Sequence, residues 1–290
     1  YTLNLGKTWK LTGQFIGSAP GDFWDSSAWF MRFARENNIY HYHIRITSIG
    51  ENFQENVNQT GFIRDDDRKE IDFEGTYKFW FKDKLIKYID LGSNNNIFWS
   101  QSNVLRSWDL DNWVSIYLNN RFSLRYKYNN EVKKQDNILY EKDFYNYRHE
   151  FTLGYNTEEW SNIKLGYTGG QNFDSKLHLF SAGGRIKLIQ ELSLSYTAQL
   201  LDFNPDSLNR STFINVFSAN YNFTRDLWIK LFAQTTWIDK RAYFYGTLGW
   251  RFKPPFGALY LIYSRDQYML DTDFLRSYNV FLKLTYPILN

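Results

Sequence analysis

Two of the four histidines, His41 and His43, are separated by a single residue in the stretch "YHYHIRI". Side chains two positions apart in a β-strand leave the same face, so both imidazoles would point the same way. Two such nitrogens can bind a metal ion, but a protein site normally supplies at least one more ligand. The sequence does not identify that ligand. We therefore predict no metal site and interpret both histidines as polar residues on one face of a strand.

A run of three carboxylates in "RDDDRK", residues 64–69, offers oxygen ligands of the kind that calcium prefers. A dedicated calcium loop also spaces its ligands at alternate positions around a central glycine, and this run has neither feature. We therefore expect a solvated loop here, and we predict no cofactor for the chain.

Nucleophilic catalysis would need a serine, a histidine and a carboxylate that converge. His178 and Ser181 are close in the sequence, but three positions along a strand place them on opposite faces. The glycine-rich stretches "GYTGG" and "SAGGR" lie in or beside predicted strands and lack the helix that must follow a phosphate-binding loop. We predict no catalytic, cofactor-binding or metal-binding residue, and we expect a protein that is not an enzyme.

The elements that would position these residues are β-strands with one apolar and one polar face. In "QELSLSYTAQLLDF", residues 190–203, apolar and polar side chains alternate almost without interruption. A period of two is typical of such strands. About sixteen candidates of roughly ten to fifteen residues each follow the pattern, longer than the strands of most globular sheets. The clearest are residues 71–81, 122–128, 145–155, 163–169, 192–200, 227–237 and 278–286.

Composition narrows the class of protein. Aromatic residues make up 20% of the chain, while 34 basic residues nearly balance 31 acidic ones, so no nucleic acid partner is indicated. There is no cysteine, which excludes disulfides and thiolate metal sites. No stretch is apolar enough for a transmembrane helix, and the mean hydropathy is −0.53. A strand that crosses a membrane needs only one apolar face, so these values are compatible with a membrane barrel.

The predicted connections alternate between tight turns and longer polar segments. Tight turns are expected at residues 6–8, 37–38, 83–84, 119–120, 157–159, 188–190, 224–226 and 253–257. Longer connections are expected in "SAPGDFWDSS", "GENFQENVNQTGFIRDDDRK", "NNEVKKQDNILYEKD", "GGQNFDS", "NPDSLNRS" and "RDQYMLDTDFLRS", with weaker signals near residues 93–103 and 239–241. In an antiparallel meander this sorting puts the tight turns at one end, as in outer-membrane barrels.

Aromatic residues would form two belts on the apolar face, as membrane interfaces favour. Near the tight-turn end we expect Tyr42, Phe79, Phe81, Phe122, Tyr155, Tyr221, Phe223, Trp250, Phe252 and Tyr286. Near the other end we expect Tyr145, Tyr147, Tyr167, Phe213, Trp237, Tyr263 and Tyr278. These belts, with the strand length and the sorted connections, favour a lipid-facing apolar surface over the core of a soluble sandwich.

The inward set is basic on balance and bulky. Its basic members would be Lys78, Arg125, Lys127, Arg148, Lys164, Arg185, Lys187, Lys230, Arg251 and Lys283, opposed by Asp72, Glu74 and Glu150. Its large members would be Trp80, Trp113, Tyr117, Trp228, Phe232, Tyr243, Tyr245 and Phe281. Basic groups can select anions or pair across strands, and the bulk favours an occluded lumen over a free channel.

The stretch "GENFQENVNQTGFIRDDDRKEIDFEG", the later "QLLDFNPDSLNRSTFINVFSANYNFTRDLWIKLFAQTTWID" and a closing "VFLKLTYPI" resemble one group of Bacteroidota envelope proteins. The resemblance is to their carboxy-terminal outer-membrane β-barrel, the domain of unknown function 5916, which follows a family-9-like carbohydrate-binding module. It implies an outer-membrane barrel without a defined activity or catalytic residues. The carbohydrate-binding module has no counterpart in this chain.

The sequence therefore predicts an all-β fold, a transmembrane antiparallel up-and-down β-barrel of about sixteen strands over residues 1–290, in the bacterial outer membrane. Its partners would be the lipid bilayer and lipopolysaccharide, with other envelope proteins or an upstream carbohydrate-binding module as further candidates. We expect a membrane anchor or conduit for an envelope or export function. The alternatives are a selective pore for small anionic or sugar-like solutes, an outer-membrane hydrolase and a soluble sandwich.

The first residues, "YTLNL", resemble the tail of one further strand that a tight turn joins to the next. Adding it makes the strand count odd, whereas bacterial single-chain barrels usually have an even number. We therefore expect a larger barrel with upstream strands, unless residues 9–15 pair directly with residues 278–286.

Overall fold

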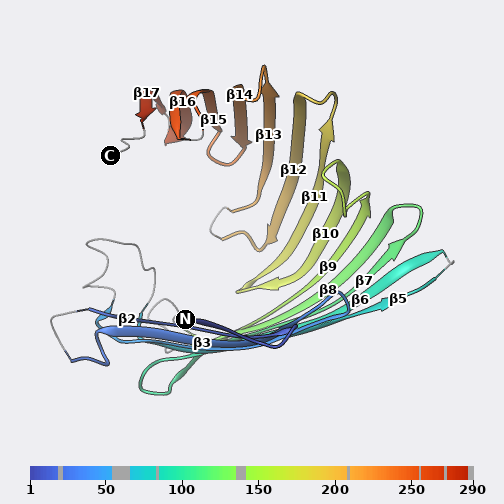
Figure 1. The fold of residues 1–290 in the computed structure, drawn as a ribbon, viewed down its shortest axis with the longest axis vertical. Helices are drawn as coiled ribbons and strands as arrows, with labels where there is room; N and C mark the ends of the chain where they lie inside the picture. The colour runs from blue at the N-terminus through green and yellow to red at the C-terminus, as the bar shows by residue number, and fades with distance from the viewer. Residues whose placement is uncertain are drawn as a thin grey trace. The chain divides into compact units, whose positions relative to one another are not determined.

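The computed structural model describes residues 1–18, 22–53, 66–82, 85–134, 142–207, 210–254, 256–270 and 273–286. Its elements are seventeen β-strands (Figure 1). They are β1 (Thr2–Leu5), β2 (Trp9–Gly17), β3 (Ser27–Glu36), β4 (Tyr40–Ile49), β5 (Arg68–Trp80), β6 (Ile86–Trp99), β7 (Leu105–Leu118), β8 (Phe122–Lys133), β9 (Phe144–Tyr155), β10 (Asn162–Asn172), β11 (Ser175–Lys187), β12 (Leu192–Asn204), β13 (Thr212–Asn222), β14 (Leu227–Thr236), β15 (Arg241–Lys253), β16 (Gly257–Leu270) and β17 (Asp273–Thr285).

The strands form one antiparallel sheet in which each pairs with the next along the chain. This confirms the predicted all-β, up-and-down topology and the short extra strand at the start. Trp9 of β2 lies opposite Leu5 of β1 on one side and Arg35 of β3 on the other, so both edges of β2 are occupied there. Along its described residues β17 pairs with β16. The pairing of residues 9–15 with residues 278–286 would join the two units defined below, and closure of the barrel stays a prediction.

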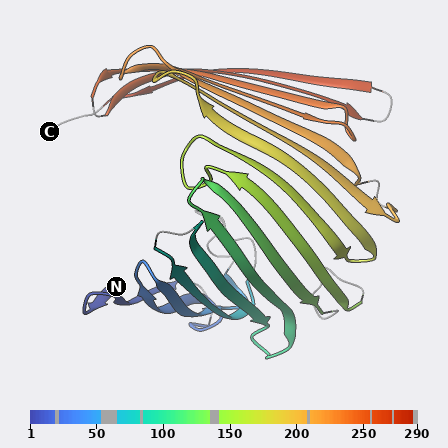
Figure 2. The same cartoon turned by 90° about the vertical axis from the view of Figure 1, so that its right-hand side faces the viewer.

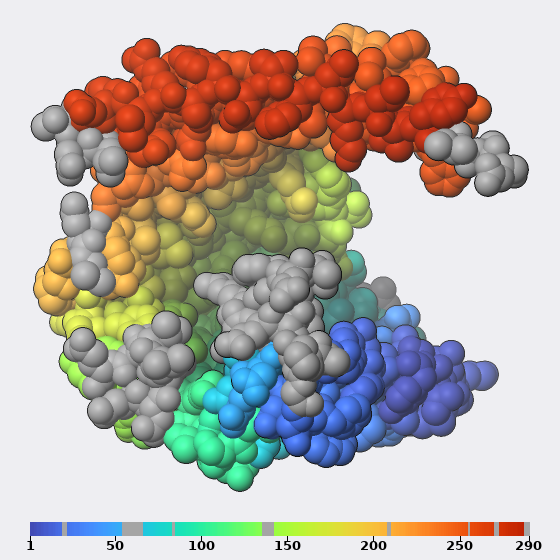
Figure 3. All heavy atoms as spheres, turned by 90° about the vertical axis from the view of Figure 1, so that its left-hand side faces the viewer, coloured from blue at the N-terminus to red at the C-terminus, as the bar shows by residue number. Residues whose placement is uncertain are grey.

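The chain divides into two compact units. Unit 1 consists of Tyr1–Asn120, Leu124–Phe151 and Gly170–Asp174, and unit 2 consists of Arg121–Ser123, Thr152–Gly169 and Ser175–Asn290. Unit 1 contains β1 to β7 and most of β8 and β9, whereas unit 2 contains β11 to β17 and most of β10. Figure 2 shows the strands of unit 2 as long neighbouring arrows, and in Figure 3 the last of them form one continuous surface of red and orange atoms.

The registers confirm the predicted faces of the strands in each unit. In unit 1, Ile44 of β4 lies opposite Phe73 of β5, and the next residue, Arg45, lies opposite Asp72. In unit 2 the same alternation holds, and Leu194 of β12 lies opposite Ile186 of β11. Apolar therefore faces apolar and polar faces polar across neighbouring strands. We call these surfaces the apolar face and the polar face of each unit.

Polar side chains supply much of the buried interior of the described residues. Buried members include Glu70, Asp72, Ser107, Ser115, Asn129 and Asn146, which all lie in unit 1. By contrast, large apolar side chains such as Leu153, Leu200 and Leu248 are exposed. This distribution inverts that of a water-soluble domain, whose fully buried residues are mostly apolar.

One connection that the sequence assigned as a long loop is a tight turn, and most of a second lies in strands. Only Phe173 and Asp174 separate Asn172 of β10 from Ser175 of β11. In the second, β16 extends to Leu270 and β17 begins at Asp273. The prediction was wrong because polar residues at the ends of long strands have the composition of loops. The two weaker signals correspond to short connections at residues 100–104 and 237–240, so tight turns occur at both ends of the sheet.

Within the described ranges, no helix has the length and apolar character that a membrane crossing requires.

Candidate functional site: a polar network on β3 to β6

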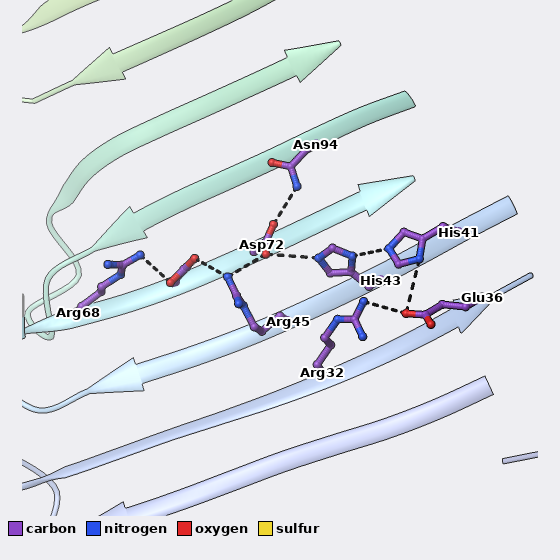
Figure 4. A network of polar contacts seen from close by, with 9 residues as sticks. Arg32, Glu36, His41, His43, Arg45, Arg68, Asp72 and Asn94 are labelled. Carbon is purple, nitrogen blue, oxygen red and sulfur yellow. Dashed lines mark hydrogen bonds and ion pairs between the residues drawn. The ribbon is translucent and has the colours of Figure 1, made fainter. Parts of the chain in front are cut away.

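A network of charged side chains crosses the polar face of unit 1 from β3 to β6 (Figure 4). The alternation in "KEIDFEG", residues 69–75, directs its three acidic residues to one face of β5. The register then places His43 opposite Glu74 and Arg45 opposite Asp72. The histidines of β4 therefore lie beside carboxylates that are about thirty positions away in the sequence.

Two arginines neutralise the buried carboxylates at one end of the network. Nη2 of Arg68 donates to Oε2 of Glu70 over 2.8 Å. Nη2 of Arg45 lies 3.2 Å from Oε1 of Glu70 and 2.9 Å from Oδ2 of Asp72, so one guanidinium connects both acids. The Glu70 side chain is only 5% exposed. A buried carboxylate without such partners would strongly destabilise the fold. The two Arg45 ion pairs also connect β4 to β5.

The histidines continue the network at its other end. Nε2 of His43 lies 3.3 Å from Oδ2 of Asp72, and Nδ1 of His43 lies 2.9 Å from Nε2 of His41. Nδ1 of His41 lies 3.7 Å from Oε1 of Glu36, which also accepts a hydrogen bond from Arg32. Both rings thus have a carboxylate on their outer nitrogen and face each other with their inner nitrogens, as Figure 4 shows.

Glu74 adds the group that the sequence did not identify. One ligand atom from each of His41, His43 and Glu74 lies within 4.8 Å of the other two, and all three residues are partly buried. The predicted common face of the two histidines is confirmed. Glu74 had been assigned to the polar face, but its place opposite His43 depends on the register between two strands, which a single sequence does not reveal.

The acidic run at residues 64–69 is only partly described, because residues 64 and 65 lie outside the described ranges. Arg68 and Lys69 belong to β5, so the predicted loop is shorter than expected. The carboxylate of Asp67 pairs with Arg106 and accepts a hydrogen bond from the backbone N–H of Gln101. The Asp67 carboxylate is therefore already bonded to protein donors. These bonds attach the residue before β5 to Arg106 of β7.

The predicted separation of His178 from Ser181 is confirmed, since His178 lies opposite Asp202 on one face and Ser181 opposite Gln199 on the other. The stretches "GYTGG" and "SAGGR" lie within β10 and β11, as expected. His178 instead contacts Tyr167 on the apolar face, where its Nδ1 lies 2.8 Å from the phenolic oxygen.

Further ion pairs extend along the polar face of unit 1. Nζ of Lys127 lies 2.9 Å from Oδ1 of Asp111, and Glu131 contacts both Lys133 at 2.9 Å and Arg148 at 3.4 Å. Several cations of this face are therefore paired across or along strands.

In comparisons with known proteins, no family model and no curated protein matches the chain. The resemblance to the Bacteroidota barrel domain therefore stays a prediction.

Proposed function

We propose that the chain is the membrane-embedded part of an outer-membrane β-barrel and acts, without enzymatic activity, as an anchor or conduit in the bacterial envelope. One observation carries the proposal: large apolar side chains are exposed along one face, while paired charges are buried on the other. Large exposed apolar surfaces mark sites of contact with a partner or a membrane. Outer-membrane strands have this alternation, with apolar residues toward lipid and polar residues toward the lumen.

The apolar surface continues from strand to strand within each unit. In unit 2, Leu248 of β15 lies opposite Leu261 of β16, and Leu261 lies opposite Leu282 of β17. All three are exposed, and Leu282 is 71% exposed. A continuous surface of this kind favours lipid as the occupant over scattered single contacts.

Strand length also supports a crossing of the bilayer. Three strands, β6, β7 and β16, have 14 residues, and a tilted transmembrane strand needs about 9–11 residues. The resemblance to the Bacteroidota barrel domain points in the same direction.

The ion pairs on the polar face favour an anchor or conduit over a pore for free anions. A basic group attracts a passing anion only if its charge is not already compensated. Lys127, Lys133 and Arg148 each have a carboxylate within salt-bridge distance.

Flotation with lipid vesicles tests the proposal. The purified chain should need detergent and should float with vesicles after refolding, resisting extraction by high salt and by alkaline carbonate. A chain that stays monomeric and soluble without detergent would contradict it and support a soluble sheet protein. Step-like conductance in planar bilayers would instead favour the pore.

A further inference from the structure

We propose that His41, His43 and Glu74 bind a divalent transition-metal ion of the zinc class on the polar face of unit 1. One ring nitrogen of each imidazole and one carboxylate oxygen of Glu74 lie within 4.8 Å of one another. Two imidazoles and one carboxylate are the donor set of many zinc sites with three protein ligands, which leave a fourth position open for water or another ligand. The site is independent of whether the apolar face meets lipid.

The outer nitrogens of both rings support this assignment. Oδ2 of Asp72 lies 3.3 Å from Nε2 of His43, and Oε1 of Glu36 lies 3.7 Å from Nδ1 of His41. A carboxylate favours a proton on the ring nitrogen that it faces, which leaves the other nitrogen as a lone-pair donor. Metal-binding histidines are usually oriented by a carboxylate in this way.

The carboxylates are themselves held in place. Nδ2 of Asn94 donates to Oδ1 of Asp72 over 3.0 Å, and Nη2 of Arg32 donates to Oε1 of Glu36 over 3.2 Å. These contacts orient both acids toward the rings, as the dashed lines in Figure 4 show. In metal sites, the ligands are commonly oriented by carboxylates behind them. Asp72 and Glu36 have this position behind the two histidines.

The inner nitrogens of the two rings face each other. Nδ1 of His43 lies 2.9 Å from Nε2 of His41, and a tautomer with the proton on one of these atoms makes the contact a hydrogen bond. In the tautomer with both protons on the outer nitrogens, two lone pairs point toward a common position that a metal ion can occupy. Glu74 adds a negative charge near the ligand atoms of both rings, which favours a divalent ion there.

The geometry requires only small movements. Two nitrogens bound to one zinc ion in a tetrahedral site lie roughly 3.3 Å apart, because each bond is about 2.0–2.1 Å long. The rings would separate by less than about half an ångström from their present 2.9 Å, and rotation of the Glu74 side chain would close the remaining distance. Opposite His43 on β3 lies Ala34, whose small side chain leaves room for the ring.

Nitrogen donors also set the class of metal. Magnesium and calcium prefer sites made only of oxygen, whereas imidazole suits zinc, copper, nickel and iron. Copper(II) would bind a site of this composition at least as tightly as zinc, so the test includes both ions.

The test uses the full chain, folded in detergent micelles and stripped of metal with a chelator. Zinc is titrated in competition with a coloured chelator, and cobalt(II) is added separately to report the geometry through its visible absorption. Wild type should bind one equivalent of zinc, and cobalt should give the intense bands of a tetrahedral site. His43→Ala and Glu74→Gln should each weaken zinc binding more than about tenfold, and Glu36→Gln should weaken it by about tenfold.

The matched control is His149→Gln, which removes a histidine from the apolar face of β9 and should leave the zinc affinity unchanged. Glu74→Gln preserves the shape of the side chain, and circular dichroism checks that each variant is folded. Zinc binding that survives both His43→Ala and Glu74→Gln would overturn the proposal. So would a folded wild type that binds neither zinc nor copper at micromolar concentrations, and the contact between the two rings would then be a hydrogen bond only.

Discussion

The phenolic oxygen of Tyr167 lies 2.8 Å from Nδ1 of His178, between β10 and β11 on the apolar face of unit 2. The apolar face of unit 1 carries the same pair, where the phenolic oxygen of Tyr126 lies 2.8 Å from Nδ1 of His149. If the apolar face meets lipid, as proposed above, a polar group on it has no water to bond with and must find a partner within the protein. Each tyrosine and histidine satisfies the other in this way.

Tyr167→Phe should therefore destabilise the fold in bilayers by about 1–3 kcal/mol, because it leaves His178 without its partner. The double variant Tyr167→Phe with His178→Leu should cost less than the sum of the two single variants. Urea unfolding from lipid vesicles measures all three. Additive costs would show that the two side chains do not depend on each other.

The two faces of β12 and β14 should differ in their tolerance of charge. Leu194→Arg and Leu231→Arg should each destabilise the fold by about 2–4 kcal/mol if they lie near the middle of the bilayer. Thr197→Arg and Gln234→Arg, which lie on the polar face, should cost far less. Refolding titrations into vesicles compare the pairs, and equal penalties on both faces would refute lipid contact.

A tryptophan covers a glycine on the polar face of unit 2. Trp228 of β14 lies opposite Gly249 of β15, and a methyl group on Gly249 would come within 2.4 Å of Cζ2 of the indole. Gly249→Ala should therefore cost about 1–3 kcal/mol, since the ring must leave its position. The control is Gly246→Ala in the same strand, where the nearest atom, Cδ2 of Leu231, lies at an ordinary 3.5 Å. Urea unfolding should separate the two variants, and equal stabilities would show that the ring moves without cost.

Asp206 organises the connection between β12 and β13. Its carboxylate accepts hydrogen bonds from the backbone N–H groups of Arg210 and Ser211, and these bonds hold the pKa of Asp206 below its ordinary value. The stabilisation from these hydrogen bonds should be fully present above the ordinary pKa of an aspartate. It should be lost as the pH falls through the lowered pKa of Asp206 in the folded chain. The protection of the Arg210 and Ser211 amides against hydrogen exchange, relative to the intrinsic exchange rate at each pH, should decrease over that range. In Asp206→Asn the exchange should lose this step, and an unchanged profile would assign the step to another group.

The faces of the strands were predictable from the sequence because side chains alternate with a period of two, whatever the neighbouring strand is. Lys230 and Trp228 lie on the polar face for that reason alone. The register was not predictable, since it depends on turn geometry and on the pattern of the partner strand. The approach of Glu74 to His43 follows from that register, and so the third candidate ligand became visible only in the structure.

The connections at opposite ends of the sheet give a test of sidedness within unit 2. Ser207 lies in the connection between β12 and β13, and Glu158 lies in the one between β9 and β10, at the opposite strand ends. If the end that carries the connection between β9 and β10 is periplasmic, an epitope inserted after Ser207 should be labelled by antibodies on intact cells. The same epitope after Glu158 should stay hidden until the outer membrane is permeabilised. Both insertions should fold, since added length in an exposed connection costs little. The reverse labelling would invert the orientation, while equal labelling of both in intact cells would contradict a membrane crossing altogether.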